Sequence, residues 1–111
     1  IAYTGYKHKM IRFIEVVNTT DHNPRMERTA KARFTVSEVW INEEYVVSIR
    51  EAHAYKKLLH EGHLPSELEH HHLFTSVITS HGNLSETHIV VGSPVSVAGR
   101  LSKDTHQLLK G

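Results

Sequence analysis

Hydrophobic and polar positions alternate over residues 73–80, where Phe74 and Val77 point to opposite faces. A period of two in a stretch rich in β-branched side chains predicts a β-strand. Residues 81–83, His-Gly-Asn, should form a turn because Gly and Asn both tolerate a positive φ angle. Residues 87–91 resume the strand pattern. This unit therefore predicts a β-hairpin.

A short helix is predicted directly after this hairpin. Ser93 offers a side-chain oxygen as the N-cap, and Pro94 stands at the first helical position, where its missing N–H is not needed. The apolar residues that follow have helical spacing. We expect the inner face of the helix to consist of Val97, Ala98 and Leu101.

Three stretches in the first half of the chain also carry strand patterns. Residues 10–18 are apolar on both faces, which favours an interior place in the sheet. Residues 33–41 change the parity of their apolar positions, which predicts a bulge or bend near Ser37 and Glu38. The single tryptophan, Trp40, is expected in the core.

The third of these stretches, residues 45–51, alternates most regularly. Tyr45, Val47 and Ile49 share one face of this predicted strand. Only residues 42–44 separate it from the preceding strand. A connection this short predicts that the two strands form an antiparallel hairpin.

Residues 52–72 then interrupt the strands with a predicted helical insertion. Apolar residues with helical spacing begin it, and they are Ala54, Tyr55, Leu58 and Leu59. Gly62 marks the expected C-terminal end of this helix. Residues 66–69, Ser-Glu-Leu-Glu, match a capping box and predict a second helical turn. An insertion of this length in a small domain is typical of a functional or interface element.

Together these elements predict an α+β fold. We expect a small antiparallel sheet of about five strands, with the helical insertion and a short helix after the last strand. A chain of 111 residues fits one domain, which we place at residues 10–111. Residues 1–9 are polar and mixed, and are expected to be a leader or a flexible N-terminus, with Met10 as an alternative start.

Composition limits the classes of function. Thirteen Lys and Arg against twelve Asp and Glu give a net charge of +1, so the chain lacks the basic balance typical of nucleic-acid binding. The absence of cysteine excludes disulfides, iron–sulfur clusters, thiol nucleophiles and thiolate zinc sites. No apolar run approaches the roughly 20 residues of a membrane helix. We expect a cytoplasmic protein that contacts neither membrane nor nucleic acid.

Catalytic motifs are missing from the sequence. It contains no G-x-S-x-G elbow, no G-x-G-x-x-G loop and no Walker pattern, and no pair of carboxylates stands out for acid–base work. We therefore expect a protein that is not an enzyme and has no cofactor.

Histidine is the compositional oddity, with eleven residues in the chain. Six of them lie in the insertion: His53, His60, His63, His70, His71 and His72. His60 and His63 are three apart with a glycine between them, which does not match the zinc-protease motif. Two interpretations stay open, an exposed surface that gains charge as the pH falls and a three-histidine metal site. We expect no tightly bound metal ion.

Arginines, an amide and an aromatic ring make up the candidate ligand site. Phe74 offers a ring for stacking, Asn83 an amide for a base edge, and Arg50 and Arg100 guanidinium groups for phosphate. If these groups converge, they would hold a nucleotide. Each also has a structural interpretation: Phe74 as a core residue, Asn83 as turn geometry, and Arg100 as a surface salt bridge.

The segment that follows the first strand becomes basic around Arg25 and Arg28. It is either a solvated loop or a mobile flap that binds anions, since arginine forks suit phosphate.

The order of YVVSI, the insertion, FTSVITSHGN and THIVVGSPVSVAGRL resembles two sets of small proteins. One is the flagellar FlbD-type proteins. The other is the phage anti-Thoeris sequestering proteins, which hold cyclic ADP-ribose-type signals and are not enzymes. The resemblance covers residues 10–101, and the histidine-rich insertion and the basic loop favour the phage type.

The phage-type resemblance implies a pocket between subunits, built from an aromatic ring, an asparagine and arginines. The positions that match are Phe74, Asn83 and Arg100, with Arg25, Arg28 and Arg50 as weaker matches.

Three functions follow as hypotheses. The first is a non-catalytic phage-type protein that binds and sequesters a cyclic nucleotide immune signal, of the cyclic ADP-ribose type or a cyclic oligonucleotide. The second is a small transcription or RNA-associated regulator, and the third is a histidine-rich metal-binding protein. We also expect a homo-oligomer, because a chain this small should not hide all of its apolar residues, in particular Leu58, Leu59, Leu108 and Leu109.

Overall fold

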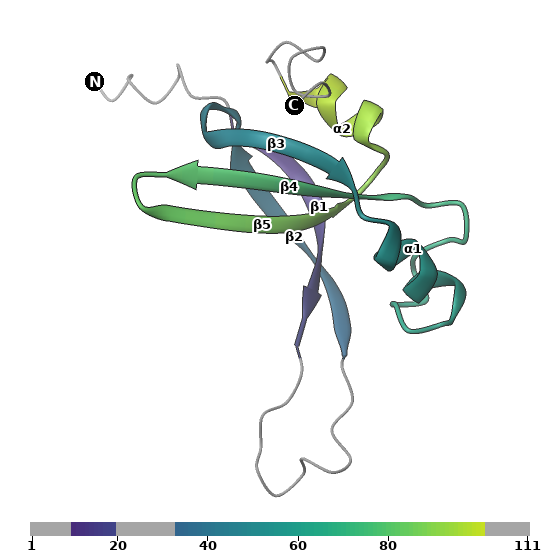
Figure 1. Cartoon of the computed structure of the whole chain (residues 1–111). Coiled ribbons are helices and arrows are strands. Elements are labelled where there is room, and N and C mark those ends of the chain that lie inside the picture. The colour runs from purple at the N-terminus through teal and green to yellow at the C-terminus, as the bar shows by residue number, and fades with distance from the viewer. Residues whose placement is uncertain (1–9, 20–32, 102–111) are drawn as a thin grey trace, which may run out of the picture.

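The computed structural model describes residues 10–19 and 33–101, and within them it shows five strands and two α-helices (Figure 1). The strands are β1 (Met10–Asn18), β2 (Phe34–Asn42), β3 (Val46–Glu51), β4 (Phe74–His81) and β5 (Leu84–Val91). The helices are α1 (His53–His60) and α2 (Pro94–Arg100), and a 3₁₀ turn, η3 (Glu43–Tyr45), joins β2 to β3. The predicted α+β class with a five-stranded antiparallel sheet is confirmed. Residues 1–9 lie outside the described residues.

The sheet is strongly curled. Its strand order is β2-β1-β5-β4-β3, so β2 and β3 are opposite edges, although only the three residues of η3 join them. Five flat strands would place the two edges about 19 Å apart, whereas a 3₁₀ turn advances only about 2 Å per residue. The sheet must therefore bend until its edges approach each other, and the β1–β2 hairpin crosses β3, β4 and β5 steeply (Figure 1).

The predicted hairpin between β2 and β3 is therefore wrong. β2 pairs with β1, and β3 pairs with β4. The short link is instead a corner, at which the Asn42 side chain accepts a hydrogen bond of 2.9 Å from the backbone N–H of Glu44. This cap turns the chain from one edge of the sheet to the other.

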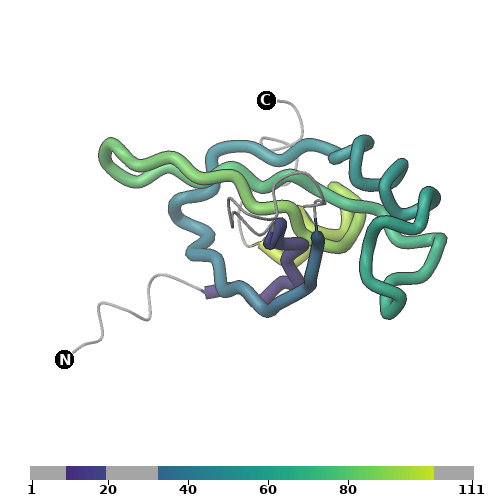
Figure 2. Tube along the Cα trace, turned by 90° about the horizontal axis from the view of Figure 1, so that it is seen from below, coloured from purple at the N-terminus to yellow at the C-terminus, as the bar shows by residue number. Residues whose placement is uncertain are grey.

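One hydrophobic cluster, the inner core, fills the concave side of the curl and includes α2. Its buried members are Ile11, Phe13, Ile41, Val46, Ile49, Val77, Val90, Val97, Ala98 and Leu101. The expected cap of α2 is confirmed, because Ser93 Oγ accepts from the N–H of Ser96 at 3.1 Å and Pro94 opens the helix. Figures 1 and 2 together show α2 across one end of the curl.

A second cluster, the outer core, lies where α1 and the segment after it pack against the sheet. Val16, Leu59, Leu64 and Phe74 are its buried members. Gly62, with φ +79°, ends the turn after α1 as expected. The second helical turn predicted at residues 66–69 is absent from this described segment, where the N–H of Leu68 closes a turn onto the carbonyl of Pro65 at 3.1 Å.

The two cores explain the parity change in β2 without a bulge. The pairing of β1 with β2 runs unbroken from Met10–Asn42 to Asn18–Phe34, so the predicted bulge near Ser37 and Glu38 is wrong. Phe34 at the start of β2 packs on the outer core, whereas Ile41 near its end is buried in the inner core. Opposite faces of one regular strand are buried at its two ends.

The bulge lies in β3 instead. The register of β3 against β4 shifts between Val46 and Ser48. Val46 and Ile49 are buried as a result, whereas Val47 is 57% exposed. The expected shared face of Tyr45, Val47 and Ile49 is therefore wrong, and Tyr45 belongs to η3.

Candidate functional site

The structure does not bring the predicted ligand residues together. Phe74 is 1% exposed within the outer core, with its ring centre 6.3 Å from that of Tyr55, so its ring has no free face for a ligand. Asn83 lies in the β4–β5 turn. Phe74 pairs with Val91 at one end of that hairpin, while the turn forms the other end. Seven residues of strand, about 24 Å, separate the two positions.

Arg100 is engaged within the fold. Its Nη2 donates a hydrogen bond to the backbone carbonyl of Arg12, and its guanidinium carbon lies 4.5 Å from the centre of the Phe13 ring. These contacts tie the end of α2 to β1. Arg50 lies exposed on the edge strand β3, and Arg25 and Arg28 lie outside the described residues.

A different place offers a hollow of about 230 Å³. Five elements contribute to it: β1, β2, η3, β4 and β5. The residues that line it are Met10, Trp40, Ile41, Asn42, Tyr45, Thr79, Glu86 and His88. We call it the Trp40 hollow.

Trp40 gives the hollow an open aromatic face. It is 53% exposed, so its expected place in the core is wrong. It shares the face of Phe34 but lies six residues further along β2, about 20 Å away and beyond the part of the strand that the outer core covers. A large exposed indole beside a hollow is a surface that could stack on a planar ring.

A second aromatic group borders the hollow. The ring of Tyr45 stacks on His81, with 4.2 Å between ring centres and 37° between planes. This contact joins η3 to the end of β4 and fixes one wall of the hollow.

His88 is the best oriented polar group of the hollow. Its Nδ1 lies 2.8 Å from Oε2 of Glu15, and the two side chains are only 17% and 20% exposed. A carboxylate only accepts hydrogen bonds, so Nδ1 of His88 must be the donor in this pair. In a neutral imidazole with this tautomer, Nε2 is left as an acceptor.

Glu86 and Asn42 complete the polar lining. Glu86 Oε1 lies 4.0 Å from Nε2 of His88 and presents a second acceptor. The Asn42 side-chain oxygen is already bonded to the N–H of Glu44, which leaves its NH₂ group as a donor. The hollow thus offers two acceptors and one donor beside aromatic rings.

Neither lysine nor arginine is among the eight residues that line the hollow in the described structure. Arg12 is the cross-strand partner of Trp40, but its Nε is bonded to Oε2 of Glu38 at 2.6 Å. The hollow is therefore suited to a planar ring with N–H donors and poorly suited to a phosphate group.

The sequence carried a signal for this site that periodicity alone could have revealed. Trp40 shares its strand face with Glu38 and Asn42, two residues to either side. An indole between polar neighbours on one face indicates exposure rather than burial.

Comparison of the chain with known protein families, curated proteins and solved structures found no match. The likeness to anti-Thoeris and flagellar proteins therefore depends on the sequence motifs alone. Across residues 10–19 and 33–101, neither helix has the length and apolar character to cross a membrane, and no three His, Cys, Asp or Glu side chains are grouped to hold a metal ion.

Proposed function

We propose that this chain is a non-catalytic binding protein that holds a small molecule by a planar ring in the Trp40 hollow. The observation that carries the proposal is the half-exposed Trp40 beside oriented hydrogen-bonding groups. Base–aromatic stacking contributes about 1–3 kcal/mol per base. The ring is thus the part of the ligand from which we expect most of the affinity.

A nucleobase with an exocyclic amino group fits the lining best. Glu86 can accept from such an amino group, and the NH₂ group of Asn42 can donate to a ring nitrogen of the base. A volume of about 230 Å³ is below the roughly 300–1,000 Å³ of pockets that enclose drug-sized ligands, so one ring system enters and the rest of the ligand stays outside.

The finer proposal is that the ligand is a cyclic nucleotide signal, of the cyclic ADP-ribose type or a cyclic oligonucleotide, and that the protein sequesters it in the cytoplasm. The sequence resemblance supports the ligand class, and the stacking surface supports recognition through a base. In this arrangement the phosphates lie outside the acidic hollow.

Trp40 itself provides the test, because it is the only tryptophan of the chain. Adenosine, cyclic ADP-ribose isomers and cyclic dinucleotides are each titrated while the tryptophan emission is recorded. We expect saturable quenching by at least one of them and recovery of the ligand unchanged from the heat-denatured complex. If none of them changes the emission, the proposal is wrong; if the ligand is converted, the protein is an enzyme.

Glu86→Gln is the matched variant, and Glu67→Gln, at an exposed position of the insertion, is its control. Replacing the carboxylate should weaken binding of amino-bearing bases at least tenfold, whereas the control should bind like the wild type. Equal affinities of the two variants for the ligand would show that it binds outside the Trp40 hollow.

A further inference from the structure

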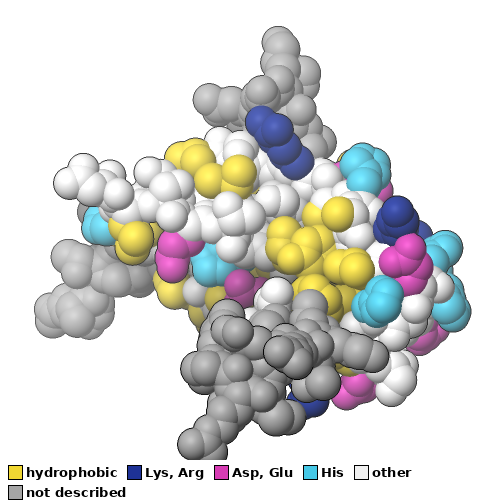
Figure 3. All heavy atoms as spheres, turned by 60° about the horizontal axis from the view of Figure 1, so that its bottom comes forward, with side chains coloured by type: hydrophobic (Ala, Val, Ile, Leu, Met, Phe, Trp, Pro, Cys, Tyr) yellow, Lys and Arg dark blue, Asp and Glu magenta, His cyan; other side chains and the backbone are white. Residues whose placement is uncertain are grey.

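A cluster of imidazoles occupies the end of the molecule opposite the β4–β5 turn. Histidine side chains gather there over α1 and the segment after it (Figure 3). His60, the last residue of α1, and His70 face each other with ring centres 5.8 Å apart and planes at 87°. Both residues are exposed. Within the described parts of the chain, the ring nitrogens of these two residues have no hydrogen-bond partner.

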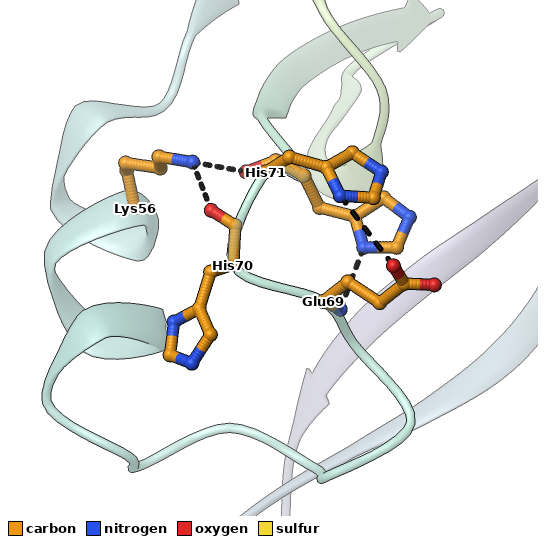
Figure 4. Close-up of polar contacts among 5 residues, drawn as sticks. Lys56, Glu69, His70 and His71 are labelled. Atoms are coloured by element: carbon orange, nitrogen blue, oxygen red, sulfur yellow. Dashed lines mark hydrogen bonds and ion pairs between the residues drawn. The ribbon is translucent and has the colours of Figure 1, made fainter.

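Lys56 holds the second of these rings in place through the backbone. Its Nζ donates to the carbonyl of His70 at 2.6 Å and to the carbonyl of His72 at 2.9 Å (Figure 4). The ammonium group of α1 thereby anchors the segment that carries His70. The separation of His60 and His70 is thus fixed by the fold, although ten residues of chain lie between them.

The neighbouring histidines are engaged with Glu69. Nδ1 of His72 accepts from the backbone N–H of Glu69 at 2.9 Å, and Nδ1 of His71 lies 3.5 Å from its carboxylate (Figure 4). Among the six histidines of the insertion, His60 and His70 are therefore the two in which neither ring nitrogen is engaged with another described residue.

We propose that His60 and His70 bind one divalent transition-metal ion of the Cu²⁺, Ni²⁺ or Zn²⁺ type. Metal–nitrogen bonds of about 2.0–2.1 Å place two imidazoles that share an ion with their centres roughly 5 Å apart. The observed 5.8 Å is close enough for a small rotation of either side chain to complete the site. Imidazole is a preferred ligand of these ions, and Cu²⁺ should bind most tightly of the three.

The end of α1 adds a second favourable contribution. The last carbonyl groups of a helix carry partial negative charge, which stabilises a cation near its C-terminus. The Lys56 ammonium opposes this by its positive charge. Because the described residues provide only two ligands, water completes the coordination, and we expect an exchangeable ion rather than a structural one.

The test is a Cu²⁺ titration of the full chain at pH 7.5, followed by calorimetry and by competition with a chelator. His60→Gln and His70→Gln should each weaken the first equivalent of Cu²⁺ at least tenfold. The double variant should be no weaker than either single variant, because one remaining imidazole cannot chelate. Circular dichroism of each variant verifies that the fold is retained.

His53→Gln and His71→Gln are the matched controls, since both remove an exposed imidazole near the same end of the molecule. Each control variant should change the affinity for the first equivalent of Cu²⁺ less than twofold. Losses of similar size in all four single variants, or additive losses in the double variant, would mean that the ion binds to scattered histidines and would overturn the site. Trp40→Ala should leave the Cu²⁺ affinity unchanged, so this result is independent of the proposed function.

Discussion

At the scale of single residues, Trp40 and Phe74 have exchanged their expected places, since Trp40 was expected in the core and Phe74 in the ligand site. Phe74 is 1% exposed and Trp40 is 53% exposed. Phe74→Ala should therefore lower the free energy of unfolding by about 3–5 kcal/mol, as for a core aromatic residue. Trp40→Ala should lower it by about 1 kcal/mol or less, because much of the indole is already in water. Urea denaturation followed by circular dichroism measures both changes, and similar losses would contradict this assignment.

Arg100 has a structural role that its place at the end of a predicted helix did not reveal. Its guanidinium lies 4.5 Å from the centre of the Phe13 ring and donates to the carbonyl of Arg12. We expect Arg100→Ala to lower the free energy of unfolding by about 1–2 kcal/mol, through loss of one cation–π contact and one charged hydrogen bond.

Arg100→Lys is the control for charge. It keeps the cation but not the planar fork, so it should recover part of the loss in a thermal melt. A fully stable alanine variant would show that these two contacts contribute nothing.

At the scale of elements, the Lys56 anchor determines how the insertion is held. The two carbonyls that it binds belong to a segment without helix or strand among residues 61–73. Lys56→Met removes the donor and should destabilise the protein by about 1–2 kcal/mol, since charged hydrogen bonds contribute about 1.5–3 kcal/mol and this one is partly exposed. Amide hydrogen exchange should accelerate in residues 61–73 and remain unchanged in the β4–β5 hairpin.

Lys57→Met is the matched control, because Lys57 is the next residue, is exposed, and makes no side-chain hydrogen bond or ion pair within the described structure. The Lys57→Met variant should have the same amide hydrogen exchange rates and the same melting temperature as the wild type. Equal acceleration in both variants would assign the effect to loss of charge rather than to the anchor.

The elements that sequence reasoning predicted correctly are those with local causes. The strand at residues 10–18, the Ser93 cap with Pro94, and the helix end before Gly62 each depend on neighbouring residues. The curl of the sheet does not depend on neighbouring residues, because it brings together strands that are distant in sequence. For that reason the relation of β2 to β3 was predicted incorrectly.

The candidate site was missed for the same reason. The Trp40 hollow brings together residues from five elements, and only the curl makes them neighbours. The pocket expected around Phe74 and Asn83 instead combined residues from opposite ends of one hairpin. Only the polar neighbours of Trp40 on its own strand could have indicated the hollow.

At the scale of the whole molecule, the edges of the sheet are the basis for expecting a homo-oligomer. Exposed leucines give less support for an oligomer than expected, because Leu59 is buried and Leu58 packs against the outer core, while Leu108 and Leu109 lie outside the described residues. In the described sheet, however, β2 and β3 each pair with one strand only. A free edge is a template for pairing with a second chain, and β3 carries the 57% exposed Val47 beside such an edge.

We therefore expect a dimer or larger assembly in light scattering at micromolar concentration, with β3 in the interface. Val47→Lys places a charge on the edge strand and should shift the mass to that of one chain, because charged edges oppose strand pairing. Val95→Lys is the matched control for added surface charge, since Val95 is 68% exposed and belongs to α2 rather than to a strand. A wild type that remains monomeric excludes the assembly, and an oligomer that withstands Val47→Lys places its interface elsewhere.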